Sequence, residues 1–325
     1  MRQVTYRSFT LSDKSKKQLS VFGKWLGGIA RWIFLLCFAV VLLYPLLIML
    51  SISVREANEV YDPTVVWIPR SVTLAHFRDV FDKLDFGGIF LTTARVSVIC
   101  SFLQMCCCCL AGYGFARFRF PGKKVLFACL LFSIIVPPQL ILIPSYTGLI
   151  EFDFFGIGSL IGLFTGKALT VSLIDTMWAY YLTAVLGAGI KGGLFCFIFL
   201  QFFKGMPAEL EEAACIDGCN RFGAFCRVML PNSRHSVITV MLFSTVWYWN
   251  DYYYNSIYFN NLPVISRTLI NVNTLLGSGL NTDSPYLVIT ETMAAAFLSV
   301  LPPLILYVVF QRFFTESIER TGIVG

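Results

Sequence analysis

The chain has 325 residues, of which 57% are hydrophobic and only 14% are charged. About a quarter of the residues are charged in an ordinary soluble domain, so this composition excludes that class and indicates a membrane protein. The net charge is +6, and the sequence has eleven cysteines but only two histidines. That balance argues against a zinc site of Cys and His, and it favours small packing thiols that stay reduced.

A basic N-terminal tail, residues 1–31, precedes the first apolar run. The tail is too long and too polar for the first region of a cleaved signal peptide, so we expect it to be cytoplasmic. Between Arg31 and Arg55 lie 23 uncharged residues, enough to span the hydrocarbon core as a helix. We therefore expect a first transmembrane helix and an external loop within residues 32–85.

Further apolar segments follow, and we expect an all-α polytopic protein with about six transmembrane helices. These segments lie near Ile89–Ala116, between Lys124 and Glu151, near Met177–Phe203, near Ser236–Phe259 and between Glu291 and Arg312. Prolines in Val136–Pro144 should kink the third helix. The Phe- and Gly-rich segment 151–176 is open to three readings: an external loop, a re-entrant piece or an additional span.

Loop charges predict the orientation of these helices. The loop after the second helix has Arg117, Arg119, Lys123 and Lys124 and no acid, whereas the loops after the third and fifth helices carry little positive charge. We therefore expect even-numbered crossings to return to the cytoplasm and both termini to lie there.

The stretch from Glu209 to Pro231 carries the densest cluster of carboxylates. Three glutamates near its start suit the first turn of a helix, and Gly218 can adopt the left-handed conformation that ends one. We expect Asn220 to cap a second helix that runs to Leu230, and Pro231 to end it. Local chemistry thus predicts a helix–turn–helix knob, and an ordinary amphipathic connector remains the alternative.

This stretch resembles the EAA loop of bacterial ABC-importer permeases, with the pattern E-A-A-x-x-D-G, then Phe, an aliphatic residue and Leu-Pro. The residues in register are Glu212, Ala213, Ala214, Asp217, Gly218, Phe225, Val228, Leu230 and Pro231. Gly112–Lys124, Trp249–Phe259 and Gln311–Gly325 resemble the carbohydrate branch, of the type of the smaller maltose-transporter permease. Two features depart from that pattern: Asp153–Thr176 is an insertion, and the tail lacks the basic residue that usually precedes the final Gly.

The resemblance implies a MetI-like permease core over residues 86–312, with the coupling loop at 205–233 and a cytoplasmic tail at 313–325. It also implies a cytoplasmic ABC ATPase dimer that receives this loop, a second permease subunit and an extracytoplasmic solute-binding protein, in the inner membrane of a bacterium. The chain lacks the phosphate loop G-x-x-x-x-G-K-[ST], so ATP must bind to the separate ATPase subunit. We expect a non-catalytic subunit surrounded by membrane lipid, with no cofactor, no metal and no nucleic acid partner.

Candidate residues for the substrate pathway are Trp249, Asn250, Asp251 and Lys191. Aromatic rings beside amides and a carboxylate suit a sugar, but an interfacial aromatic belt and ordinary helix packing fit the same residues. Lys191 suits an anionic sugar, a partner such as Asp251, or snorkelling toward an interface. Alternative functions are a permease for a non-sugar solute, such as an amino acid, phosphate or a metal, and a polytopic membrane enzyme; the sequence lacks G-x-S-x-G and H-E-x-x-H.

Overall fold

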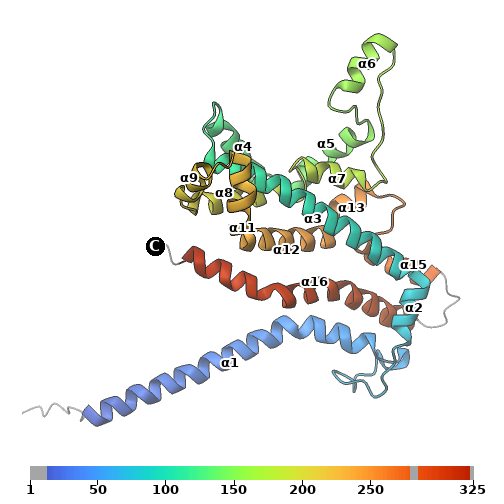
Figure 1. Cartoon of the computed structure of the whole chain (residues 1–325). Helices are drawn as coiled ribbons and strands as arrows, with labels where there is room; N and C mark the ends of the chain where they lie inside the picture. The colour runs from blue at the N-terminus through green and yellow to red at the C-terminus, as the bar shows by residue number, and fades with distance from the viewer. Residues whose placement is uncertain (1–12, 279–284, 323–325) are drawn as a thin grey trace, which may run out of the picture.

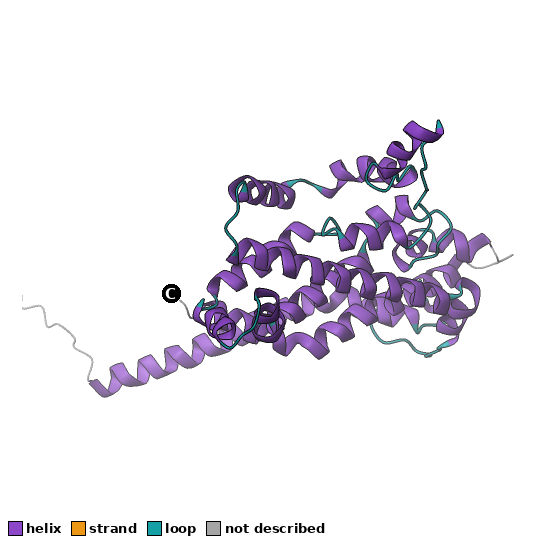
Figure 2. Ribbon diagram, turned by 45° about the horizontal axis from the view of Figure 1, so that its top comes forward, coloured by secondary structure: helices purple, strands orange, loops and turns teal. Residues whose placement is uncertain are grey.

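The computed structural model describes residues 13–278 and 285–322 (Figures 1 and 2). Within those ranges, all named secondary-structure elements are helices. The all-α expectation is therefore confirmed. The longer helices are α1 (Asp13–Ser53), α2 (Ala75–Leu84), α3 (Phe86–Arg117), α4 (Lys123–Ile135), α5 (Pro138–Ile150), α8 (Gly192–Gly205), α12 (Arg234–Asn250) and α16 (Pro285–Gly322). The shorter ones are α6 (Ile157–Thr165), α7 (Trp178–Val185), α9 (Glu209–Ile216), α10 (Arg221–Ala224), α11 (Leu230–Asn232), α13 (Tyr253–Tyr258), α14 (Ile265–Ile270) and α15 (Val272–Ser278).

Helix α3 is the central element of the packing and takes part in three apolar clusters along its length. The first cluster joins α3 to α8 and α12, the second joins it to α7, α12 and α13, and the third joins it to α2, α15 and α16. At Gly112 an added Cβ would lie 2.6 Å from Cβ of Phe199 and 2.9 Å from the backbone nitrogen of Leu200. The close contact between α3 and α8 therefore requires a glycine at this position.

Helix α1 packs along α16, and its first half diverges from the other helices (Figure 1). Its apolar side chains are largely exposed, for example Trp32 at 72% and Leu36 at 68%. An apolar helix with so little protein around it faces lipid or another subunit.

Three helices are long and apolar enough to cross a membrane, Lys24–Ser53, Phe86–Arg117 and Tyr286–Phe313. The number rises to five if two bent helix pairs each count as one span. Helices α4 and α5 form one of these pairs and meet at 106°, which confirms that the prolines interrupt the third segment. The expected fourth segment is divided into α7 and α8 by the glycine-rich stretch between Leu186 and Lys191.

The segment 151–176 contains only the nine-residue helix α6, which projects away from the other helices (Figure 1). At a rise of about 1.5 Å per residue, α6 covers roughly half the hydrocarbon thickness. Phe152 and Val171 pair through a short antiparallel bridge at its base. The reading of this segment as an additional span is therefore wrong.

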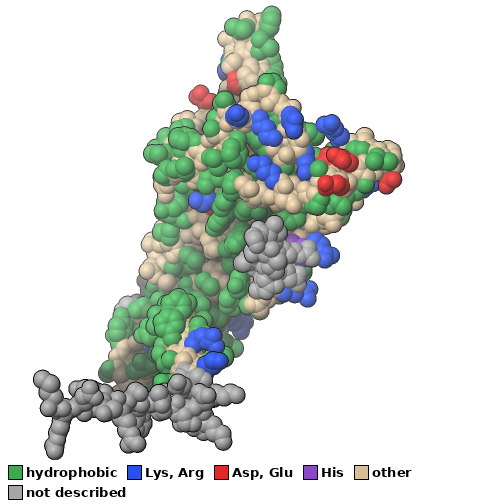
Figure 3. Space-filling view, turned by 90° about the vertical axis from the view of Figure 1, so that its left-hand side faces the viewer, with side chains coloured by type: hydrophobic (Ala, Val, Ile, Leu, Met, Phe, Trp, Pro, Cys, Tyr) green, Lys and Arg blue, Asp and Glu red, His purple; other side chains and the backbone are tan. Residues whose placement is uncertain are grey.

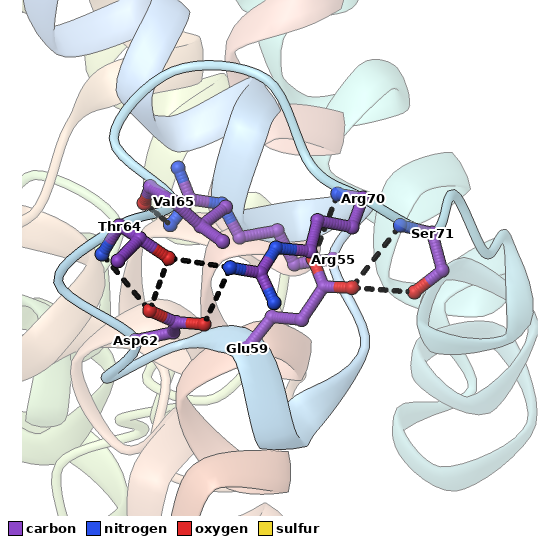
Figure 4. Close-up of polar contacts among 7 residues, drawn as sticks. All are labelled: Arg55, Glu59, Asp62, Thr64, Val65, Arg70 and Ser71. Atoms are coloured by element: carbon purple, nitrogen blue, oxygen red, sulfur yellow. Dashed lines mark hydrogen bonds and ion pairs between the residues drawn. The ribbon is translucent and has the colours of Figure 1, made fainter.

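The connection between α1 and α2, the α1–α2 cap (Arg55–Thr73), is held by polar contacts (Figure 4). The buried guanidinium of Arg55 donates to two backbone carbonyls of the cap, at 2.9 and 2.7 Å. The carboxylate of Glu59 accepts from the backbone N–H groups of Arg70 and Ser71, at 3.0 and 3.1 Å, and from the Ser71 hydroxyl at 2.7 Å. These bonds from the Ser71 hydroxyl and the two N–H groups lower the pKa of Glu59.

Candidate functional site

The first half of the predicted knob forms as expected. Helix α9 has three glutamates in its first turn, and Gly218 follows it in the left-handed conformation with φ of +87°. The side chain of Asn220 then accepts a hydrogen bond from the backbone N–H of Gly223 at 2.6 Å, which caps the next helix. We call the residues from Glu209 to Asn232 the knob.

The second half of the knob differs from the expected single helix ending at Pro231. Helix α10 has only four residues, a π-helical turn spans Phe225–Met229, and α11 follows directly. Pro231 lies in the first turn of α11, where its missing N–H is not needed, so it does not end the helix. The turn comes at Ser233, immediately before α12.

Apolar side chains of the π-helical turn hold the knob against the other helices. Phe225 is 4% exposed and Met229 is fully buried, and both belong to the cluster formed with α3 and α8. The ring centroid of Phe225 lies 4.7 Å from that of Tyr113 and 6.2 Å from that of Phe203. Burial of these side chains gives the knob a firm attachment.

A charged contact fixes α9 to the end of α3. The hydroxyl of Tyr113 donates to Glu211 Oε1 at 2.6 Å, and Nε of Arg117 lies 3.3 Å from Glu211 Oε2. Arg117 also donates to the carbonyl of Met206 at 2.9 Å. The Arg117 and Glu211 side chains are only 14% and 16% exposed, so solvent screens this ion pair less than a surface pair.

The opposite face of the knob is open. Glu212, Ala213, Ile216 and Asp217 are exposed, with Ile216 at 85%, whereas Ala214 is buried toward the rest of the protein. Among the described residues, no hydrogen bond or ion pair engages the carboxylates of Glu212 and Asp217. An exposed apolar side chain flanked by carboxylates is typical of an interaction surface.

Basic side chains lie beside the knob. Figure 3 views the end of the molecule that carries α9 and shows Lys and Arg side chains gathered near a group of Asp and Glu side chains. Four basic side chains, Arg119, Lys123, Lys124 and Lys204, line one hollow formed by the loop after α3, the start of α4 and the end of α8.

A cavity of about 290 Å³ lies where the broken helices meet. Its walls come from the α4–α5 break, the glycine-rich break between α7 and α8, and the rings of Tyr180, Tyr248, Tyr254 and Tyr258. Lys191, with φ of +57°, is the one charged side chain among the described residues that line it. The combination of tyrosine rings, a single cation and an irregular backbone can recognise a small polar ligand.

Two hydrogen-bond networks support the walls of this cavity. Tyr248 donates to Oε1 of Gln104 at 2.6 Å, and Nε2 of Gln104 donates to the carbonyl of Ile190 at 2.8 Å. The hydroxyl of Tyr180 lies 2.6 Å from Oδ2 of Asp251 and 2.7 Å from Oδ1 of Asn255. The buried side chains thus hold the break between α7 and α8 against α3 and α12.

The four predicted pathway residues do not come together. Trp249 is 6% exposed and its indole donates to the carbonyl of Ser299 at 3.0 Å, so it packs α12 against α16. Asp251 supports the cavity through Tyr180 but is absent from its lining, and Asn250 is exposed elsewhere. Lys191 lines the cavity and makes no ion pair with Asp251.

Sequence reasoning missed Tyr113, Glu211 and Arg117 as members of the knob's attachment. The spacing of Tyr113 and Arg117, one helical turn apart, was the available signal, because residues at i and i+4 share a face. The sequence does not show which of the three neighbouring glutamates contacts that face. Tyr113 and Glu211 lie 98 positions apart in the sequence, so only the packing of α9 against α3 brings them together.

The family described as "Binding-protein-dependent transport system inner membrane component" matches residues 109–320. The polygalacturonan/rhamnogalacturonan transport system permease protein YtcP of Bacillus subtilis (strain 168) is 27% identical over 293 residues, covering 87% of this chain and 93% of YtcP. The inner membrane ABC transporter permease protein YcjP of Escherichia coli (strain K12) is 26% identical, covering 96% of this chain and 99% of YcjP.

A crystal structure of a bacterial ABC transporter involved in the import of the acidic polysaccharide alginate has a chain of similar fold. The TM-score is 0.69 at 18% identity, and the match covers 94% of this chain and 100% of that chain. Curated relatives also include the diacetylchitobiose uptake system permease protein NgcG of Streptomyces coelicolor (strain ATCC BAA-471 / A3(2) / M145), 25% identical over 88% of this chain and 85% of NgcG. These relatives are transport permeases and not enzymes.

Proposed function

Because this chain belongs to the family of binding-protein-dependent transport inner membrane components, we propose that it is a permease subunit of an ATP-driven carbohydrate importer. A separate ABC ATPase dimer supplies the energy, a second permease completes the pathway, and an extracytoplasmic binding protein delivers the cargo. The chain resides in the inner membrane of a bacterium. The names of the relatives, which include polygalacturonan, arabinooligosaccharide and diacetylchitobiose permeases, support carbohydrate as the cargo class.

The proposed topology has six crossings, with both termini in the cytoplasm. The crossings are α1, α3, the α4–α5 pair, the α7–α8 pair, α12 and α16. Helices α8 and α9 form the second bent pair, at 75°. We exclude α9 from the membrane because its first turn holds three glutamates. The basic residues beside α9 support a cytoplasmic position for the knob.

The observation that carries the proposal is the two-sided construction of the knob. One side is fixed to α3 by Glu211 and by the buried Phe225, whereas Glu212 and Asp217 on the other side are free to meet a partner. A knob held in this way moves together with α3 when the ATPase dimer closes. Gly218 permits the turn between α9 and α10, because its left-handed backbone conformation favours glycine.

The cavity lined by Lys191 and the tyrosine rings is this subunit's proposed contribution to the cargo pathway. Tyrosine rings can stack on the C–H faces of a sugar, and their hydroxyl groups can bond to its hydroxyl groups. Asp251 has a positioning role there, because it holds Tyr180 at the cavity wall. Trp249 and Asn250 have no contact with the cavity, so they are not part of this proposal.

The test is co-purification of partner proteins from native membrane, for wild type, Glu212→Lys and Glu209→Lys. The wild type should bring down an ATPase and a second permease, and Glu212→Lys should lose the ATPase, because the substitution reverses a charge on the open face. Glu209→Lys makes the same charge change at another exposed side chain of α9, which controls for net charge. Purification of the wild-type chain without an ATPase would refute the proposed importer.

A further inference from the structure

We infer that a basic hollow beside the knob binds the phosphate headgroup of an anionic phospholipid. The hollow has a volume of about 620 Å³ and lies between the end of α3, the start of α4 and the last turns of α8. Its basic side chains are Arg119, Lys123, Lys124 and Lys204. The inference requires only that this end of the helices meets a membrane surface, so it is independent of transport.

No acidic side chain among the described residues forms an ion pair with the basic side chains of the hollow. The described residues that line it include no acid, and Arg119, Lys124 and Lys204 form no ion pair in the described parts of the chain. Lys123 donates to the carbonyl of Phe118 at 2.9 Å, which leaves its charge uncompensated as well. Like charges gathered in one concave site attract a counter-ion, because the field in a concave low-dielectric site is focused.

The basic side chains of the hollow come from separate segments of the chain and converge on one site, unlike basic residues that only set the orientation of a membrane helix. Basic residues that only fix the direction of a helix need to lie on the cytoplasmic side, but they need not face one another. Here Lys204 comes from α8, and its ammonium group lies 5.5 Å from the ring centroid of Phe127 on α4. The hollow is therefore formed by tertiary packing as well as by the basic loop.

The walls indicate a lipid as the source of the phosphate. Phe115, Phe120 and Phe127 line the hollow beside the charges, and the adjoining surface of α4 exposes Val125 at 66% and Leu126 at 52%. A headgroup with acyl chains matches both the cations and this apolar surface, whereas a free phosphate would use the cations alone. Basic pockets between transmembrane helices on the cytoplasmic side are known to hold anionic headgroups.

Native mass spectrometry of the purified full-length chain in detergent tests the inference, with phosphatidylglycerol and phosphatidylcholine of identical acyl chains as probes. Phosphatidylglycerol should bind more tightly to the wild type, and Lys124→Gln/Lys204→Gln should weaken it by about 30-fold, since each basic residue contributes to lipid attraction. The conservative pair Lys124→Arg/Lys204→Arg should retain the binding. The control Arg78→Gln/Lys167→Gln removes two exposed charges elsewhere in the chain and should leave it unchanged.

Several outcomes would overturn the inference. Equal binding of the two lipids would show that the headgroup charge is not recognised, and equal loss in the control variant would show an effect of net charge alone. Displacement of the lipid by low millimolar inorganic phosphate would identify a site for a free anion. Unchanged phosphatidylglycerol binding in Lys124→Gln/Lys204→Gln would place the lipid elsewhere on the surface.

Discussion

Substitution of Glu211 by Gln tests whether the knob and α3 move as one body. The substitution keeps the size of the side chain and an oxygen that can accept from Tyr113, but it removes the charge that faces both Tyr113 and Arg117. A hydrogen bond to a charged group contributes about 1.5–3 kcal/mol, against about 1 kcal/mol for a neutral one. The ion pair contributes up to about 1 kcal/mol more, so the attachment of α9 to α3 should weaken by about 2 kcal/mol in total. The equilibrium between attached and detached knob should then shift by roughly 30-fold toward the detached form.

The assay is the ratio of sugar transported to ATP hydrolysed by the complete transporter in proteoliposomes. In Glu211→Gln the ATPase should remain bound and hydrolyse ATP, and uptake should fall by about tenfold or more because a loosened knob transmits less of the motion. Glu209→Gln is the matched control, since Glu209 is exposed on the same helix. An uptake ratio in Glu211→Gln equal to that of Glu209→Gln would refute the reasoning. Loss of the ATPase from Glu211→Gln would instead show that Glu211 contacts the partner.

Three further predictions concern other parts of the molecule. Gly112→Ala should destabilise the chain by about 1–3 kcal/mol in thermal unfolding, because the added Cβ would clash with α8. Gly114→Ala should show no such loss, because the nearest atom to an added Cβ there, on Phe118, is 3.9 Å away. Lys191→Gln should reduce the uptake of an acidic oligosaccharide more than that of a neutral one of equal length, and equal reductions would exclude recognition of charge. The pKa of Glu59 is lower in the folded protein than in the unfolded chain, so its ionised carboxylate stabilises the α1–α2 cap at pH values above the unfolded-state pKa. This stabilisation is lost as the pH falls through the folded-state pKa of Glu59. Hydrogen exchange at the Ser71 amide, corrected for intrinsic rates, should therefore accelerate as the pH falls below the ordinary pKa of a glutamate in the wild type. Glu59→Gln should show no such step.

Much of the architecture followed from local sequence features. Apolar runs without charge predict membrane helices, and the prolines near Val136 predict the interruption between α4 and α5. Gly218 and Asn220 predict the turn and the cap of the knob, because left-handed backbone and N-caps favour those residue types. These features depend on a few neighbouring residues, so sequence alone determines them.

Packing decided what local sequence left open. Pro231 sits in a helical first turn and does not stop the helix, since a π-helical turn brings Phe225 and Met229 into the core just before it. Glu211 faces α3 and Glu212 faces outward, although adjacent glutamates have the same local preferences. Trp249 packs against α16 while Lys191 lines the cavity. Contacts between segments far apart in the chain select among locally equivalent side chains, and only the tertiary structure specifies those contacts.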